Sequence, residues 1–154
     1  MPEYTLNALL RNPVFMAPAI GWCAAQLLKV IIYTAINHEF RTDRIFGSGG
    51  MPSSHSATVC ALCTAAACEY GLGSFEFAVT FFLAFIVMYD AIGVRREAGE
   101  QARVINEMRR QFSNMYKVFT DVEELREFIG HSPLQVLCGA VLGILISLAV
   151  CYSM

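Results

Sequence analysis

The sequence predicts an all-α membrane protein, built as a bundle of about four transmembrane helices with one amphipathic helix at the membrane surface. Two observations predict this class. Hydrophobic residues make up 56% of the 154-residue chain and charged residues only 16%, whereas a soluble domain carries about 25% charged residues. A chain this short cannot hide so much apolar surface in one core. We therefore expect residues 1–154 to form a single membrane-embedded domain.

The apolar residues gather into four candidate spans, which is the second observation. The spans cover roughly 12–37, 53–71, 75–94 and 132–152, and a bilayer crossing needs about 20 residues. Lys29 is the one charged residue of the first span. In the second span alanines recur every fourth residue, and in the fourth span two glycines and a serine do the same. Small residues at this spacing predict that both helices pack closely against protein.

The stretch 95–127 differs from the spans because it holds seven basic and seven acidic residues. Its apolar residues recur at spacings of three and four, which is one face of an amphipathic helix. We expect this helix to lie along the membrane surface or against the mouth of the bundle. The apolar face consists of Ala98, Ala102, Ile105, Met108, Phe112, Met115 and Phe119.

Charge distribution predicts the orientation of the chain in the membrane. Four spans place the 38–53 and 95–131 loops on one side, with nine Lys and Arg residues, and leave only Arg11 on the other. The positive-inside rule therefore predicts that the basic face is cytoplasmic, and we expect an integral protein of the plasma membrane. Its surroundings are membrane lipids. The net charge of −2 gives no indication of nucleic-acid binding.

Chemically capable side chains converge on this basic face. His55 and His131 stand at the starts of the second and fourth spans, Arg95 follows the third, and Lys29 can extend toward the same side. Two histidines, fixed cations and two helix N-termini form an anion site with acid–base or nucleophilic capacity. Phosphate suits such a site best. The glycines and serines of 49–56 add backbone that a phosphate can approach closely.

Several sequence blocks resemble a known superfamily. The run Gly-Gly-Met-Pro-Ser-Ser-His-Ser-Ala at 49–57 is similar to the Pro-Ser-Gly-His motif of the type-2 phosphatidic acid phosphatases, whose superfamily includes the vanadium haloperoxidases. The blocks at 25–29, 89–96, 98–102 and 130–136 extend the likeness to the small divergent branch of membrane proteins in that superfamily. The resemblance covers most of the chain.

This resemblance implies a phosphatase that hydrolyses a lipid-linked phosphate through a phosphohistidine, without a metal or other cofactor. His131 matches the nucleophile and His55 the general acid, which later activates water. The residues that would hold phosphate oxygens are Lys29, Ser53, Ser54 and Arg95.

The chain also departs from the superfamily pattern. Gln135 stands four residues after His131, where the superfamily places an aspartate, and no Ser-Arg pair precedes this histidine. Gln135 can complete a helix capping box with Ser132, or it can orient the histidine, and Asp90 is a candidate for the missing carboxylate. The departures favour an alternative, a non-catalytic anionic-lipid binding or scaffold protein that retains the phosphate pocket. A small transporter is a third hypothesis.

The number of helices and the cysteines lead to two further expectations. The superfamily bundle has more helices than this chain provides, so a homodimer could complete the site. The six cysteines lie in apolar stretches, and we interpret them as reduced packing residues. We find no metal-ligand spacing among the Cys, His and acidic residues.

Overall fold

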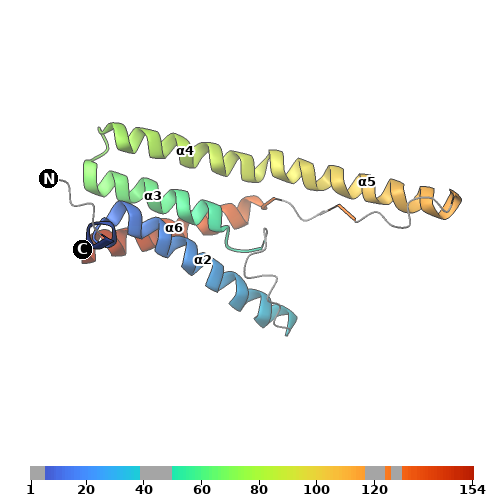
Figure 1. The fold of residues 1–154 in the computed structure, drawn as a ribbon, viewed down its shortest axis with the longest axis horizontal. Helices are drawn as coiled ribbons and strands as arrows, with labels where there is room; N and C mark the ends of the chain where they lie inside the picture. Colours follow the sequence, from blue (N-terminus) through green and yellow to red (C-terminus); the bar gives the residue numbers. More distant parts are fainter. Residues whose placement is uncertain (1–5, 39–49, 117–123, 126–129) are drawn as a thin grey trace.

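The computed structural model describes residues 6–38, 50–116, 124–125 and 130–154; of Arg95 and residues 113–116 it describes the backbone alone. Within these ranges the chain is helical, as predicted (Figure 1). The helices are α1 (Leu6–Leu10), α2 (Pro13–Asn37), α3 (Ser54–Tyr70), α4 (Phe75–Ile92), α5 (Val94–Tyr116) and α6 (Pro133–Ser153).

Helix α3 is the centre of the bundle and packs against α2, α4 and α6. Its alanines allow this close approach: Ala57, Ala61 and Ala65 are fully buried. On α6, a side chain at Gly139 or Gly143 would collide with the backbone of α3. The prediction of close packing along the stripes of small residues is therefore confirmed, and it explains how one short helix can contact three neighbours.

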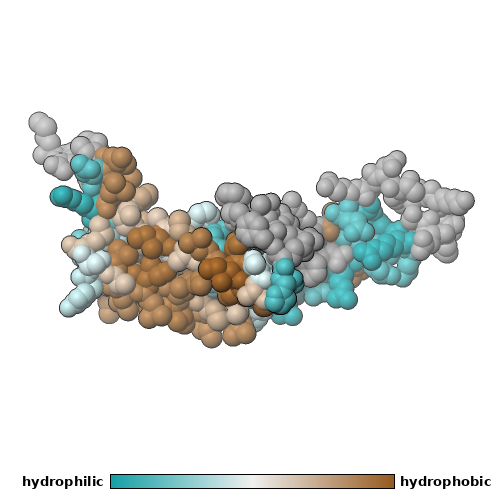
Figure 2. All heavy atoms as spheres, turned by 90° about the horizontal axis from the view of Figure 1, so that it is seen from below, coloured by the Kyte–Doolittle hydropathy of each residue, from teal (hydrophilic) through white to brown (hydrophobic). Residues whose placement is uncertain are grey.

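Among the described residues, three helical segments are long and apolar enough to cross a membrane: α2, the segment that begins with α4 and continues into α5, and α6. Helix α3 occupies the second predicted span but has 17 residues, which corresponds to about 25 Å against about 30 Å for the hydrocarbon layer. On the face shown in Figure 2, apolar side chains occupy much of the bundle, whereas polar ones gather on the projecting end and at the opposite end of the bundle. The short α3 is therefore enclosed by helices that meet the lipid.

The amphipathic helix forms as α5, and the structure places it as a continuation of α4 that extends beyond the bundle (Figure 1). The backbone explains this: the Gly93 amide donates to the Tyr89 carbonyl at 2.9 Å, and the Gly93 carbonyl accepts from the Glu97 amide at 3.0 Å. These two hydrogen bonds bridge the junction, although Gly93 itself, with φ −91° and ψ −90°, departs from helical geometry and separates the two helices. The apolar face stays exposed at Ile105 and Met108, while Phe119 lies outside the described residues.

Helix α5 contacts the described residues 124–125 that follow it in the chain. The Asn106 side chain is 2% exposed and pairs with the backbone of Leu125, whose amide donates to Oδ1 at 3.0 Å and whose carbonyl accepts from Nδ2 at 2.8 Å. Arg110 and Glu124 form an exposed ion pair beside it. These contacts attach the segment that leads toward His131 to the projecting helix.

Candidate active site

Capping interactions fix where the two helices of the site begin. The Ser53 hydroxyl accepts from the Ser56 amide at the start of α3, and the Ser132 hydroxyl accepts from the Gln135 amide at the start of α6. The Gln135 side chain accepts in return from the Ser132 amide, so the predicted capping box is present. His55 therefore sits in the first turn of α3, and His131 immediately precedes the cap of α6.

Two backbone hydrogen bonds connect these helix starts, one to each other and one to helix α4. The Ser53 amide donates to the Gln135 carbonyl at 3.0 Å, which joins α3 to α6. The His131 amide donates to the Ala91 carbonyl at 3.1 Å, which joins the approach to α6 to the last turn of α4. The site therefore has a frame made of backbone groups from three helices.

The frame brings the two predicted histidines together. The ring centroids of His55 and His131 are 6.1 Å apart and the ring planes are inclined by 59°. His131 is 5% exposed, whereas His55 is exposed. At this separation a single small anion can contact both rings, with one ring protected from solvent and the other open to it.

Gln135 determines which nitrogen of the His131 ring carries the proton. Its Oε1 accepts from the Ser132 amide at 3.1 Å, which identifies that atom as the amide oxygen, and the same atom lies 3.2 Å from His131 Nδ1. An oxygen of this kind cannot donate, so Nδ1–H is the donor. In neutral His131, Nε2 is therefore the unprotonated ring nitrogen, the atom whose lone pair a nucleophilic step would use.

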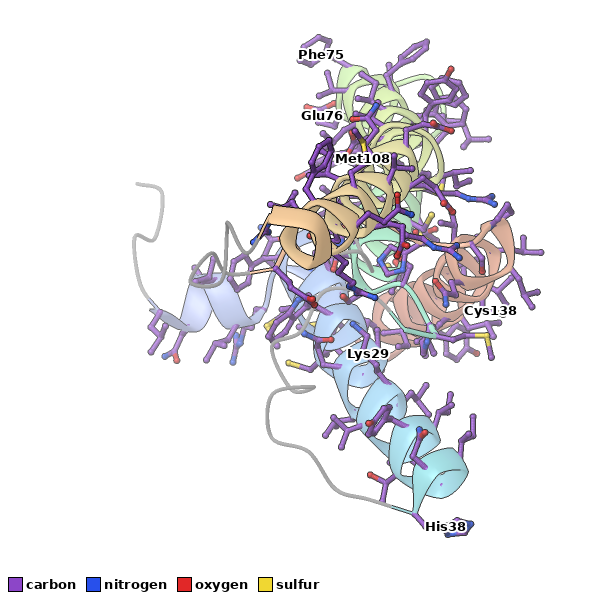
Figure 3. The ribbon with its side chains drawn as sticks, turned by 90° about the vertical axis from the view of Figure 1, so that its right-hand side faces the viewer. Lys29, His38, Phe75, Glu76, Met108 and Cys138 are labelled. Carbon is purple, nitrogen blue, oxygen red and sulfur yellow. The ribbon has the colours of Figure 1, made fainter. Side chains whose placement is uncertain are left out.

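Lys29 approaches the same segment of chain from α2. It is 5% exposed and lies at mid-length on α2, far from His38 at the helix end (Figure 3). Gly50, with a φ of 87°, packs over the lysine stem: a Cβ there would lie 3.3 Å from Lys29 Cγ. The chain from Gly50 to His55 thus links the lysine to the histidine pair.

Beside Lys29 lies a pocket of about 220 Å³. Its walls come from α2 and from the Gly50–Met51 segment. Sequence reasoning did not identify this pocket, although its α2 residues follow Lys29 at helical spacings that place them on one face. The lining includes Lys29, Ile32, Tyr33, Ile36 and Met51.

The remaining predicted site residues differ in burial and in their hydrogen-bond partners. Ser53 and Ser54 are buried, but the Ser53 amide is used by Gln135 and its hydroxyl accepts from both the amide and the hydroxyl of Ser56. The Ser53 N–H is therefore engaged within the protein, and phosphate binding by the backbone around Ser53 and Ser54 stays a prediction. Asp90 is half-buried, one residue before the Ala91 carbonyl that binds the His131 amide. Arg95 lies in the first turn of α5, and its side chain is outside the described part.

The described residues contain no cluster of three His, Cys, Asp or Glu side chains that could hold a metal ion. The groups that the site offers are instead two imidazoles, a buried ammonium and the first turns of two helices. Such groups bind anions, transfer protons and provide a nitrogen nucleophile.

Comparisons with known proteins agree with the resemblance seen in the sequence. A family model described as "Divergent PAP2 family" matches residues 10–146. The chain is 41% identical over 153 residues to the uncharacterized membrane protein YuiD of Bacillus subtilis (strain 168), covering 94% of this chain and 97% of that protein. No solved structure matches the chain.

Proposed function

Because the chain belongs to the divergent PAP2 family, we propose that it is a membrane phosphatase that hydrolyses a lipid-linked phosphate through a phosphohistidine. The observation that supports this proposal most directly is the arrangement of His55 and His131. His131 is buried with its Nδ1–H bound to Gln135, and His55 lies 6.1 Å away between ring centroids. One ring is suited to attack and the other to proton transfer.

The proposed reaction proceeds in two steps. In the first, His131 Nε2 forms a bond to phosphorus while the bond from phosphorus to the lipid oxygen breaks, and protonated His55 gives its proton to that oxygen. In the second, neutral His55 takes a proton from water, the water oxygen bonds to phosphorus, and the N–P bond breaks to release orthophosphate. Lys29 and Arg95 neutralise phosphate oxygens in both steps, and the proposed steps use no metal.

The charge distribution supports a location for this reaction. In the sequence, nine basic residues fall in the stretches 38–53 and 95–131, which precede the two histidine-bearing helix starts, so we propose a plasma-membrane protein whose site faces the cytoplasm. There it meets its substrate among the surrounding membrane lipids. A homodimer is proposed as the assembled form, because this chain has fewer helices than the superfamily bundle that it resembles.

One observation favours the second candidate function, a scaffold that binds an anionic lipid without turnover. The Gln135 Oε1 is shared between His131 and the Ser132 amide, and an amide stabilises a positively charged imidazole less than a carboxylate does. In the serine-protease triad, exchange of the equivalent aspartate for asparagine costs about 10⁴ in turnover. A site with this glutamine could bind a lipid phosphate and hold it uncleaved.

Phosphate release from a panel of lipid phosphates by the purified protein tests the proposal. We expect His131→Ala to abolish both turnover and the phosphoenzyme, and His55→Ala to slow turnover about 10²–10⁴-fold. His38→Ala is the matched control, because this third histidine lies exposed at the far end of α2 and should be without effect. Vanadate, which mimics five-coordinate phosphorus, should inhibit the protein, whereas EDTA should not. Saturable binding of lipid phosphates without turnover on any of them would establish the scaffold instead.

A further inference from the structure

Helices α3 and α6 each carry a cysteine in the last turn, at the end of the bundle that lies away from the histidines. Cys68 stands two residues before the end of α3, and Cys151 stands two residues before the end of α6. The two helices start together and run in the same direction, so they reach the same end of the bundle (Figure 1). Both cysteines are free thiols in the structure, and the proposed phosphate chemistry uses neither of them.

The packing of α6 on α3 sets the register of the two cysteines. A Cβ at Gly143 would collide with the Ala57 backbone. Two turns further along each helix, the same register brings Cys151 to Ala65, and Cys151 packs against the buried cluster that includes Ala65. Cys68 follows Ala65 by three residues and therefore lies on the same face of α3. The two thiols consequently meet, close enough for a side-chain hydrogen bond between them.

The two thiols differ in their access to solvent. Cys68 is exposed, whereas Cys151 is half-buried, with its Sγ 4.0 Å from the Ser147 hydroxyl. They lie at the end of the bundle opposite to the starts of α3 and α6, and the proposed orientation places this end outside the cytoplasm. Disulfides persist outside the cytoplasm and are reduced within it. One thiol is therefore open to an oxidant, and the other is positioned to react second.

We propose that Cys68 and Cys151 are an oxidation site, at which a small-molecule disulfide outside the cytoplasm converts the two thiols into an intramolecular disulfide between α3 and α6. The Cys68 thiolate attacks one sulfur of the oxidant, forms a mixed disulfide and releases one thiolate. The Cys151 thiolate then attacks the Cys68 sulfur and releases the second thiolate. The two cysteines are oxidised, the oxidant is reduced to two thiols, and these take up the two protons that the cysteines lose.

The disulfide ties together the far ends of the two helices whose starts carry the histidines. The starts are already joined by the hydrogen bond between the Ser53 amide and the Gln135 carbonyl, so oxidation fixes the helix pair at both ends. The proposal replaces, for these two residues, the expectation that all six cysteines stay reduced. It rests on the proposed orientation but not on the proposed phosphatase activity, because neither cysteine belongs to the histidine site.

Oxidation of the purified protein in detergent tests the pairing. The reduced protein is treated with oxidised glutathione, its remaining thiols are alkylated, and mass spectrometry of the proteolysed protein identifies the linked cysteines. We expect most chains to carry a Cys68–Cys151 link, and the melting temperature to rise by about 5–10 °C and to fall again with dithiothreitol. This comparison of oxidised and reduced protein needs no substitution. If Cys68 and Cys151 stay unlinked, or link only between separate chains, the proposal is overturned.

Substitutions test the order of the two steps. In Cys151→Ala the reaction should stop at the mixed disulfide, so glutathione should remain on Cys68, and the melting temperature should not rise. Cys23→Ala is the matched control, because Cys23 is an exposed cysteine on α2, and this variant should form the link as the natural chain does. Loss of the link in the control variant would contradict the assigned pair.

The state of the pair in cells tests the location. When thiols are blocked with N-ethylmaleimide before lysis, the isolated protein should already contain the Cys68–Cys151 disulfide. A pair that links in the purified protein but stays reduced in cells would overturn the part of the proposal that places the disulfide outside the cytoplasm. Absence of phosphatase activity alters none of these results, so failure of the proposed function and failure of this proposal are distinguishable.

Discussion

Exchange of Gln135 for glutamate tests whether this residue acts on His131 or only caps α6. The change replaces an amide by a carboxylate at the atom that lies 3.2 Å from His131 Nδ1. The capping contact should survive, because the introduced carboxylate can still accept from the Ser132 amide and glutamate is a favoured residue at this position of a capping box. The thermal stability of the bundle should therefore be preserved.

The electrostatic effect can be worked out from this geometry. A contact of 3.2 Å places the carboxylate and imidazolium charges about 4 Å apart, where an effective dielectric constant of about 20 gives an attraction of about 4 kcal/mol. Desolvation of the carboxylate removes part of this gain, and a net effect of about 1.4–2.7 kcal/mol corresponds to 1–2 pH units.

The direction of the expected pH shift follows from the proposed role of His131 as the nucleophile. A nearby negative charge favours the protonated imidazole, which cannot attack, so the acid limb of the kcat/KM profile should move to higher pH by about 1–2 units. Above that limb the same charge stabilises the positively charged phosphohistidine, and turnover should rise about 10–100-fold. A pH–rate profile of the purified variant measures both effects, and an NMR titration of the His131 ring measures the first without turnover.

Gln101→Glu is the matched control for this experiment. It makes the same change of charge at an exposed position on α5, and it should alter neither the acid limb nor the plateau. If Gln135→Glu also leaves the limb, the plateau and the ring titration unchanged, Gln135 serves only as a helix cap and the argument for its catalytic contact is refuted.

Three further predictions concern the fold. Gly139→Ala should lower the free energy of unfolding by about 1–3 kcal/mol, because its Cβ would collide with the Ser53 carbonyl; thermal unfolding in detergent measures this, and Gly73→Ala, in open space, should be neutral. Asn106→Ala removes both hydrogen bonds to Leu125, so hydrogen exchange of the Leu125 amide should accelerate while the melting temperature of the bundle is kept; unchanged exchange would contradict the pairing. In a variant without native cysteines, an impermeant reagent added to intact cells should label a cysteine at position 2 but not one at position 100, and the reverse would overturn the predicted orientation.

Much of the bundle and the histidine pair could be predicted because a membrane restricts the possible folds. Consecutive spans must alternate in direction, so residues at the starts of the second and fourth spans face the same side. His55 and His131 were placed together on this basis, and their ring centroids are 6.1 Å apart. The small residues of α3 and α6 predicted close packing, since small side chains such as those of glycine, alanine and serine allow helix backbones to approach closely.

The features that the sequence did not predict depend on groups that every residue has. The Ser53 amide binds the Gln135 carbonyl, and the His131 amide binds the Ala91 carbonyl, yet any non-proline residue carries an N–H and a C=O. No pattern of side chains marks which of them pair between helices. For this reason the sequence does not indicate that the Ser53 amide, in the segment predicted to bind phosphate, is engaged within the protein. The sequence also did not predict the pocket beside Lys29, because this pocket depends on how far α2 leans away from its neighbouring helices.

The backbone frame has a consequence for every experiment on the site. The hydrogen bonds that hold the starts of α3 and α6 in place use the Ser53 and His131 amides, and truncation of an imidazole leaves both amides intact. His55→Ala and His131→Ala therefore remove side chains from a frame that remains paired. Removal of the exposed His55 ring should lower the free energy of unfolding only slightly. Removal of the buried His131 ring should lower it more, because the contact with Gln135 Oε1 is lost. The Gln135 oxygen keeps the Ser132 amide as a partner in both variants, so lost turnover in a variant that still melts cooperatively can be attributed to chemistry and not to a displaced helix.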